Sequence, residues 1–493
     1  MAGVQHKENE RTGVRGSILR GKRYLAKNMF FLTVGQFGTK LLGFFLVPLY
    51  TSVLTSAEYG TYDLYSVTVS LLIPILTLNI ADSTTVFLLD KDSPREGIVS
   101  VSLKYYARSV LLFAALVCAN RLFGLFPLLN AYPAFLLLMF ALGNLSQLLL
   151  NFARGFDRIK DVAVSGVLCS AVMIALNIVL LIPLRMGLAG YYLAFIGGAL
   201  AQSAYLCVSL RIFRFIRTGR QDKKLKKDML AYSCPMMLNS VSWWVNSVSD
   251  RYVVTWLCGI VQNGIYSVAY KIPSILNMFQ GIFSQAWTLS AVQDFDRDDR
   301  GGFFSKMYGL YNACMTCLCS LLIACTRPMA QLLYANDFYA AWRFVPFLLV
   351  ASVFGALSGY LGGIFAAVKD SKSFAVSSAV GAVMNIVLNI VLIHFIGTIG
   401  AAIATMASYF STWLVRIARV QKSMRLNLNL ARDCVAYTLL VLQSVSVLCS
   451  DRFPLYSNVL CVFLLVTLFA LYGRTTLLAI RFLKEKALHK EKK

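Results

Sequence analysis

The pentapeptide LNIVL occurs twice in the chain, at residues 176–180 and at residues 388–392. Apolar segments resemble one another by chance, so a single match of this kind would carry little weight. Three matches in the same order, at nearly the same spacing, indicate that one half of the chain duplicates the other. The other two matches pair Gly187 and Gly190 with Gly397 and Gly400, and Gly60-Thr61-Tyr62 with Gly264-Ile265-Tyr266.

The composition places both halves in a membrane. Of the 493 residues, 58% are hydrophobic and only 14% are charged, and the mean hydropathy is +0.66. Soluble domains contain about 25% charged residues, so this chain lies outside the soluble range. A helix of about 20 apolar residues spans a bilayer, and the chain has room for about fourteen such helices joined by short connections. We therefore predict an all-α integral membrane protein with no large soluble domain.

The repeated unit is predicted to contain six helices, and two more helices follow the second copy. An even number of spans returns each copy to the same side of the membrane. The copies are then parallel repeats related by an axis along the membrane normal, with a substrate cleft between two lobes. The predicted parts are a basic N-terminus (1–28), an N-lobe (29–210), a basic linker (211–230), a C-lobe (231–419), two C-terminal helices (434–477) and a basic tail (478–493).

The net charge of +24 would suggest a nucleic-acid partner in a soluble protein. In a membrane protein the distribution of the charge matters more than its sum. If the N-terminus is cytoplasmic, most of the 47 Lys and Arg residues fall in inner segments. This asymmetry follows the positive-inside rule, so we predict cytoplasmic N- and C-termini and no nucleic-acid partner. The outer segments contain only Arg121, Arg185, Arg327, Arg343 and Arg452.

Polar residues inside predicted spans indicate which helices line the cleft, because such residues are costly against lipid. In the span predicted at 29–53, Gln36 and Lys40 share one helical face with Thr33 and Gly43. The span at 231–256 has a matching stripe of Asn239, Ser242, Asn246 and Ser249, which Asp250 and Arg251 follow.

The next predicted span, at 264–287, adds Lys271 and also Pro273, which should bend or loosen this helix. Three cations within the membrane predict a basic cavity suited to a phosphate or pyrophosphate headgroup. The predicted substrate-binding residues are Lys40, Arg251, Lys271, Gln36 and Asn246.

These charges have a second interpretation, in which they only hold helices together through ion pairs. Asp250 is free to reach Lys271 across the helix boundary, and Asp82 and Asp250 are the candidates for coupling transport to an ion. No catalytic residue, cofactor or metal site is predicted. The 12 cysteines lie mostly in apolar spans without His or carboxylates at ligand spacing, and the acidic residues 294–299 do not follow the calcium-loop pattern.

Three groups of motifs point to a known family. They are 48–55 with Glu58-Tyr59-Gly60 and Tyr62; 232–235, Asp250-Arg251, Gly264-Ile265-Tyr266, Lys271 and Gln285-Ala286-Trp287; and Asn385, Asn389, Gly397, Gly400-Ala401-Ala402 and Thr405. With these motifs the chain resembles the polysaccharide transporter family of O-antigen flippase type, within the superfamily of MATE multidrug exporters and the lipid II flippase. Relatives often carry Arg near the end of the second span, where this chain has Asp82-Ser83-Thr84.

The resemblance implies a MATE-like fold in the bacterial cytoplasmic membrane. It implies a flippase that moves undecaprenyl-pyrophosphate-linked oligosaccharide from the inner to the outer leaflet by alternating access, for cell-surface polysaccharide biosynthesis. Na+ or H+ would drive the cycle, and the last two helices would bind the lipid tail. The resemblance also allows contact with membrane lipids, the polysaccharide polymerase and glycosyltransferases.

Two alternatives stay open. A multidrug or lipid II exporter would share the fold, although an exporter of cationic drugs would favour an apolar or acidic cavity. A membrane polymerase or lipid-linked glycosyltransferase of the same pathway belongs to another class. Such enzymes need a sizeable outer domain, whereas the longest predicted outer connection, 327–342, is short. We therefore expect a transporter and not an enzyme.

Overall fold

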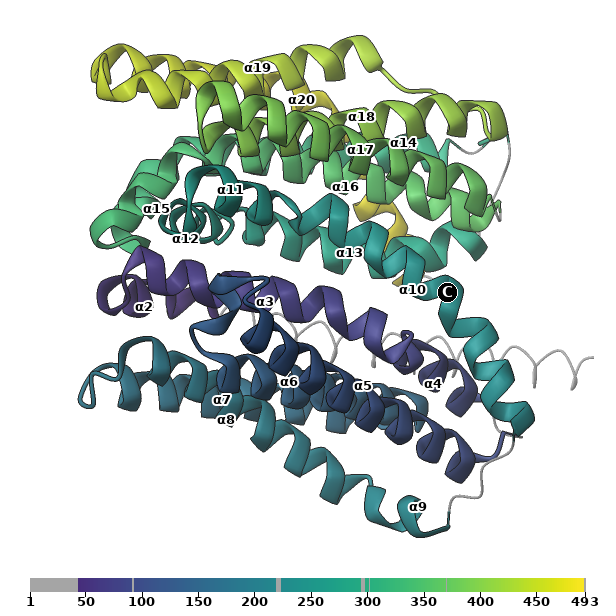
Figure 1. Ribbon diagram of the computed structural model, residues 1–493. Helices are drawn as coiled ribbons and strands as arrows, with labels where there is room; N and C mark the ends of the chain where they lie inside the picture. The colour runs from purple at the N-terminus through teal and green to yellow at the C-terminus, as the bar shows by residue number, and fades with distance from the viewer. Residues whose placement is uncertain are drawn as a thin grey trace, which may run out of the picture. The chain divides into compact units, whose positions relative to one another are not determined.

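The computed structural model describes residues 43–90, 93–218, 223–293, 298–300, 302–368 and 370–491, and within these ranges all regular structure is helical (Figure 1). The first helices are α2 (Val47–Val53), α3 (Ser56–Thr77), α4 (Ile80–Leu89), α5 (Arg95–Phe123), η1 (Pro127–Asn130), α6 (Pro133–Gly155), α7 (Ile159–Leu181), α8 (Gly187–Ser209), α9 (Ile212–Thr218) and α10 (Lys223–Val248). The remainder are α11 (Asp250–Cys258), α12 (Ile260–Ala269), α13 (Pro273–Gln293), α14 (Phe303–Ala324), α15 (Thr326–Leu333), η2 (Asn336–Arg343), α16 (Val345–Ala367), α17 (Ser371–Ile396), α18 (Ile399–Ser423), α19 (Leu430–Leu448), η3 (Cys449–Asp451) and α20 (Pro454–Glu491).

Among the described residues, nine helices are long and apolar enough to cross a membrane, or ten if the bent pair α3 and α4 counts as one span. The protein is therefore a multi-pass membrane protein, and the predicted all-α membrane fold is confirmed. The total of about fourteen spans stays a prediction, because most of the first predicted span lies outside the described residues. The nine helices are α5, α6, α7, α8, α14, α16, α17, α19 and α20.

Several spans predicted as continuous helices are broken. The second span, which the hydropathy of the sequence predicts as one helix over 62–85, instead bends by 60° between α3 and α4. Leu78 and Asn79 adopt left-handed φ values of 53° and 54° there, and Pro74 lies one turn earlier. Left-handed residues cannot continue a right-handed helix, and proline removes a backbone donor from it. The apolar composition of this segment gave no indication of where the bend would lie.

The two spans predicted at 231–256 and 264–287 are also interrupted. The first is divided into α10 and α11 at Ser249, and α11 ends at Gly259, whose φ is 87°. The second is divided into α12 and α13 by three residues that end just before Pro273. The predicted effect of Pro273 on this helix is confirmed. Both interruptions lie next to charged residues of the predicted site.

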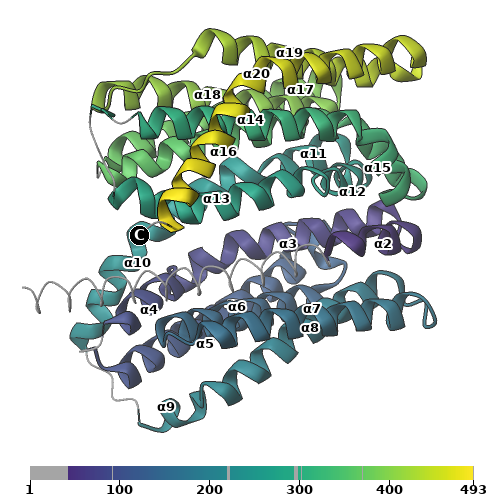
Figure 2. The same ribbon diagram turned by 180° about the vertical axis from the view of Figure 1, so that it is seen from behind.

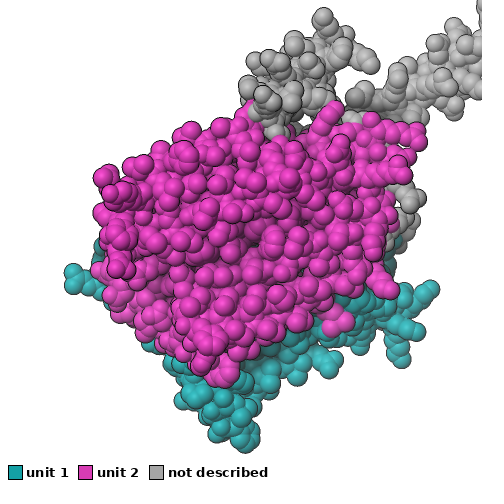
Figure 3. All heavy atoms as spheres, turned by 90° about the horizontal axis from the view of Figure 1, so that it is seen from above, with its two compact units in different colours: residues 1–46, 72–237 teal, residues 47–71, 238–493 magenta. Residues whose placement is uncertain are grey.

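The chain divides into two compact units (Figure 3). Unit 1 comprises residues 1–46 and 72–237. Its apolar core is formed by residues of α4, α5, α6 and α8 and of the start of α10. Unit 2 combines residues 47–71 with residues 238–493. At its centre α16, largely buried, packs against α13, α14 and α18, and α20 lies across α14 (Figure 2). The predicted six-plus-six division of the lobes stays a prediction.

Two copies of a sequence motif lie against each other inside unit 2. A Cβ atom on Gly264 would lie 1.9 Å from the carbonyl oxygen of Ser56, and one on Gly60 would lie 2.2 Å from that of Ile260. Helices α3 and α12 therefore touch through their backbones, and only glycine fits at the crossing. Gly60 and Gly264 are the first residues of the two motifs that the sequence repeat pairs.

We expect Gly264→Ala to destabilise the protein, because the new methyl group meets backbone and not a movable side chain. The cost of such overpacking is about 1–3 kcal/mol, or more where backbone must shift. The matched control is Gly281→Ala in α13, where nothing lies within 4 Å of the new Cβ. Thermal unfolding of both purified variants in detergent measures the effect, and equal midpoints would contradict a tight crossing.

Candidate functional site

Four charged residues come together in unit 2, and we call them the charged cluster. Asp63 lies on α3, Asp250 and Arg251 begin α11, and Lys271 lies in the break between α12 and α13. The helix interruptions explain why Asp250, Arg251 and Lys271 come together, because residues at helix ends turn away from the regular helical path. Two cations and two carboxylates balance in formal charge. The described part of the predicted cavity is therefore less basic than the sequence suggested.

Arg251 and Asp63 form an ion pair, with the Nε of Arg251 3.4 Å from the Oδ2 of Asp63. Their side chains are only 16% and 13% exposed. The guanidinium also lies over the ring of Tyr270, 4.8 Å from its centroid. The Nε makes no hydrogen bond, so charge attraction and packing hold the pair without the bidentate geometry of a strong arginine–carboxylate contact.

Asp250 is buried and is held by hydroxyl groups. Tyr266 and Tyr270 donate to its Oδ2 at 2.7 and 2.6 Å, and Thr405 on α18 donates at 3.4 Å. The backbone N–H of Arg251 donates to Oδ1 at 2.9 Å. Within the described residues no cationic side chain lies within ion-pair distance of Asp250. The expectation that Asp250 reaches Lys271 is therefore wrong, because two tyrosine hydroxyls already occupy its oxygen.

A layer of amides and hydroxyls continues from Asp250 toward α17. Ser249 donates to the Oδ1 of Asn385 at 3.4 Å, and the Nδ2 of Asn385 donates to Ser408 at 3.2 Å. Asn389 donates to the same Oδ1 at 2.9 Å, while its own Oδ1 is buried without a hydrogen-bond partner. Carboxylate, hydroxyl and amide oxygens suit a small hard cation or a proton. The described residues contain no group of three or more His, Cys, Asp or Glu side chains arranged for a metal.

Lys271 differs from Arg251 in its contacts. Its Nζ lies 5.7 Å from the centroid of the Tyr50 ring, and Asp63 attracts it at longer range. No carboxylate in the described part of the chain lies within ion-pair distance of it, and the side chain is partly exposed. Lys271 is thus the cation of the charged cluster that is best placed to meet an added anion.

The other predicted site residues are placed as follows. Gln36 and Lys40 lie outside the described residues, as does the side chain of Asn246. Asp82 is in unit 1, where it is exposed and accepts a 2.7 Å hydrogen bond from Asn79. Asp63 was missed, although it lies three residues after Gly60 in a repeated motif and therefore one turn further along the same helix face.

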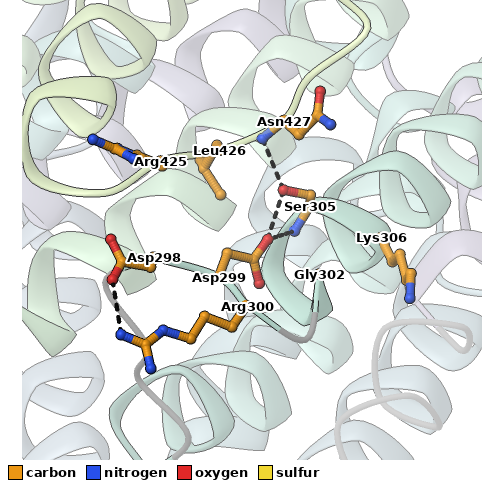
Figure 4. A pocket seen from close by; sticks show the side chains of 9 residues that line it. All are labelled: Asp298, Asp299, Arg300, Gly302, Ser305, Lys306, Arg425, Leu426 and Asn427. Carbon is orange, nitrogen blue, oxygen red and sulfur yellow. Dashed lines mark hydrogen bonds and ion pairs between the residues drawn. The ribbon is translucent and has the colours of Figure 1, made fainter.

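Of the acidic residues 294–299, Asp299 binds the start of α14, whereas residues 294–297 lie outside the described residues. The Asp299 carboxylate accepts the backbone N–H groups of Phe304 and Ser305 at 3.0 and 2.9 Å and thereby caps α14. Ser305 in turn accepts the N–H of Asn427 at 2.9 Å. These residues border a surface hollow of about 840 Å³ (Figure 4), lined by Asp298, Asp299, Arg300, Gly302, Ser305, Lys306, Arg425, Leu426 and Asn427.

A family described as polysaccharide biosynthesis protein matches residues 25–288, which is more than half of the sequence. The chain belongs to this polysaccharide biosynthesis protein family. The match contains the charged cluster and both motifs of the glycine crossing. No curated protein matches the sequence significantly.

Solved structures share the fold. An inward-facing multidrug resistance MATE transporter of the MOP superfamily has a TM-score of 0.65 at 14% identity, over 78% of this chain and 95% of that chain. The lipid II flippase MurJ, in an inward closed conformation, has a TM-score of 0.62 at 14% identity, over 90% of this chain and 99% of that chain. At such low identity the likeness shows the fold alone, and it confirms the predicted MATE-like architecture.

We expect Asp63 and Arg251 to be energetically coupled. In a double-mutant cycle of Asp63→Asn and Arg251→Gln, the coupling energy should reach about 1–3 kcal/mol, because each single change leaves a largely buried charge unpaired. The exposed pair Asp298 and Arg300, at a comparable 3.4 Å, is the control. Exposed pairs contribute about 0–1 kcal/mol. Strictly additive effects of the Asp63 and Arg251 changes on unfolding in detergent would rule out the ion pair.

Proposed function

We propose that the protein is a flippase that moves an undecaprenyl-pyrophosphate-linked oligosaccharide from the inner to the outer leaflet of the bacterial cytoplasmic membrane. The product would supply cell-surface polysaccharide synthesis. The observation that carries the proposal is Lys271, a cation within a membrane protein of the polysaccharide biosynthesis family that lacks an ion-pair partner among the described residues.

The electrostatic argument concerns the cost of an intramembrane charge. A cation inside a bilayer is unfavourable unless a partner or water compensates it, and such residues usually mark a transport pathway. Arg251 already has Asp63 as its partner. A pyrophosphate at Lys271 would supply the missing negative charge. Its oxygens would also accept hydrogen bonds from the guanidinium group of Arg251.

The fold supports transport between leaflets. MurJ is described as a lipid II flippase and matches 90% of this chain, whereas the MATE transporter is described as a multidrug resistance protein. In this proposal the lobes 29–210 and 231–419 alternate in access, both termini are cytoplasmic, and the C-terminal helices α19 and α20 contact the lipid tail. Polysaccharide polymerase and glycosyltransferases are the partners expected to act on the same lipid-linked chain.

An exporter of cationic drugs is the second candidate function, and the two carboxylates of the charged cluster favour it. Neither carboxylate is open to a drug, however. Asp63 is paired with Arg251, and Asp250 accepts three side-chain hydroxyls. The balance therefore favours an anionic cargo. A lipid II exporter would use the same headgroup chemistry and differs from the first proposal only in the glycan.

We propose Asp250 as the residue that couples transport to Na+ or H+. It is buried at 2% exposure and adjoins Thr405 and the layer of Ser249, Asn385 and Asn389. Uptake of a cation or proton would change the charge of this layer and the hydrogen bonds of both tyrosines. The alternative, Asp82, is exposed and accepts a hydrogen bond from the Nδ2 of Asn79.

Replacement of Lys271 by Gln should abolish rescue of a deletion strain, because it removes the cation that meets the pyrophosphate. We expect at least about a tenfold loss of surface polysaccharide. Lys271→Arg should keep part of the activity, and Lys306→Gln on α14 is the matched control. The deletion strain itself should accumulate lipid-linked oligosaccharide on the cytoplasmic side. Normal surface polysaccharide in that strain would refute the proposed cargo.

Ion coupling is tested with the purified protein in liposomes. Transport should respond to a Na+ or a proton gradient, and Asp250→Asn should remove that response, because the amide cannot change charge. Thr405→Val separates loss of an oxygen ligand from loss of charge. Transport that ignores both gradients in the wild-type protein would mean that Asp250 has only a structural role.

A further inference from the structure

The ion pair between Asp63 and Arg251 joins two distant parts of the sequence. Asp63 lies on α3, within the segment 47–71 that unit 2 takes from the first half of the chain. Arg251 lies on α11, and Asn263 on α12 donates to the Oδ2 of Asp63 at 3.5 Å. The carboxylate thus links α3 to α11, which carries Arg251, and to α12, which ends two residues before Lys271.

Asp63 reaches Arg251 because of the backbone contact between α3 and α12. Gly60 lies one turn before Asp63, and its carbonyl oxygen accepts from the Nδ2 of Asn263 at 3.3 Å. Two more hydrogen bonds hold α3 against the second half of the chain. The indole N–H of Trp244 donates to the carbonyl oxygen of Val67 at 3.0 Å, and the hydroxyls of Thr68 and Tyr252 lie 2.5 Å apart. Separation of α3 from these helices would remove the carboxylate from Arg251.

The pair is also weak enough to be replaced. Its closest approach is 3.4 Å and the Nε makes no hydrogen bond, whereas phosphate oxygens accept bidentate arginine hydrogen bonds at about 2.7–2.9 Å. Lys271 directly follows Tyr270, whose ring centroid lies 4.8 Å from the guanidinium of Arg251. An anion that binds Lys271 therefore also comes close to Arg251, the cation that Asp63 now pairs with.

We propose that Asp63 is an internal substitute for the phosphate of the ligand, which holds Arg251 while α3 and α12 are in contact. When an anionic headgroup binds Lys271 and takes Arg251, Asp63 is left as an unpaired buried carboxylate beside a second anion. Both conditions are unfavourable, so the arrival of the headgroup releases α3 from α11 and α12. Asp63 is a positioning residue in this scheme, and the scheme rests on the proposed anionic cargo.

Helix α3 begins in unit 2 and continues past Leu71 into unit 1. Release of its first part from α11 and α12 would therefore leave α3 freer to move. The anion of the cargo would thereby supply the difference in affinity between two conformations that any ligand-driven change requires. A neutral or cationic molecule would lack this effect.

The test uses the full-length protein in nanodiscs, with inorganic pyrophosphate as the probe and calorimetry as the readout. Asp63→Asn should bind pyrophosphate about tenfold more tightly than wild type, because the internal competitor is gone. The tightening should vanish when Arg251→Gln is added. Asp337→Asn, an exposed carboxylate in the same unit, is the matched control and should leave the affinity unchanged.

A second measurement follows a neighbouring contact, that of α2, the helix directly before α3, with η2, which packs on α12. It does not depend on the folding of an Asp63 variant. Ser52 on α2 and Asn336 on η2 lie together, since the Nδ2 of Asn336 donates to the carbonyl oxygen of Ser52 at 3.5 Å. With the 12 native cysteines replaced, pyrophosphate should slow disulfide formation between Ser52→Cys and Asn336→Cys several-fold.

The outcomes separate the two claims. If wild type does not bind pyrophosphate, the anionic cargo is wrong and this inference falls with it. If wild type binds pyrophosphate but Asp63→Asn binds it no more tightly, the cargo stands and the role of Asp63 is overturned. The role of Asp63 would also be overturned if Asp63→Asn tightened pyrophosphate binding equally in the presence and absence of Arg251→Gln. An unchanged rate of disulfide formation would contradict the release of α3.

Discussion

The contact of Gly60 with Gly264 is the constraint on which the described site depends. Because neither residue has a side chain, the backbones of α3 and α12 approach more closely than other residues would permit. This approach places Asp63 one turn further along α3, beside Arg251. The charged cluster therefore forms at a junction between the first and second halves of the sequence, and a change at the crossing would alter the electrostatics of the site.

The helix breaks are the second structural requirement. Continuous helices through 231–256 and 264–287 would distribute Asp250, Arg251 and Lys271 around regular helical faces. The interruptions at Ser249, Gly259 and the residues before Pro273 instead bring helix ends to one place. Irregular backbone within a membrane protein is tolerated where it is buried in protein or lines a polar cavity. Asp250 and its hydroxyl partners satisfy this condition, since they supply hydrogen bonds where the regular helical pattern stops.

Much of the fold was predictable because its signals are additive along the chain. Hydropathy, charge asymmetry and the repeated motifs all depend on many residues, and they led to the all-α membrane architecture. Arg251, Lys271 and Asp250 were recognisable because charges inside apolar segments are costly. The partner of Arg251 was not, because Asp63 belongs to another helix and only the glycine crossing brings it there. The tyrosine partners of Asp250 were not recognisable either, because they lie outside α11 and no spacing rule for ion pairs predicts them.

The central claim is that an anionic, lipid-linked saccharide crosses the membrane through the charged cluster. The direct measurement is the leaflet distribution of a fluorescent undecaprenyl-pyrophosphate oligosaccharide in liposomes that contain the purified protein, read with a membrane-impermeant quencher. The account predicts that wild-type protein makes the inner-leaflet pool accessible to the quencher and that Lys271→Gln does not. Equal accessibility with wild type, with Lys271→Gln and with protein-free liposomes would contradict it.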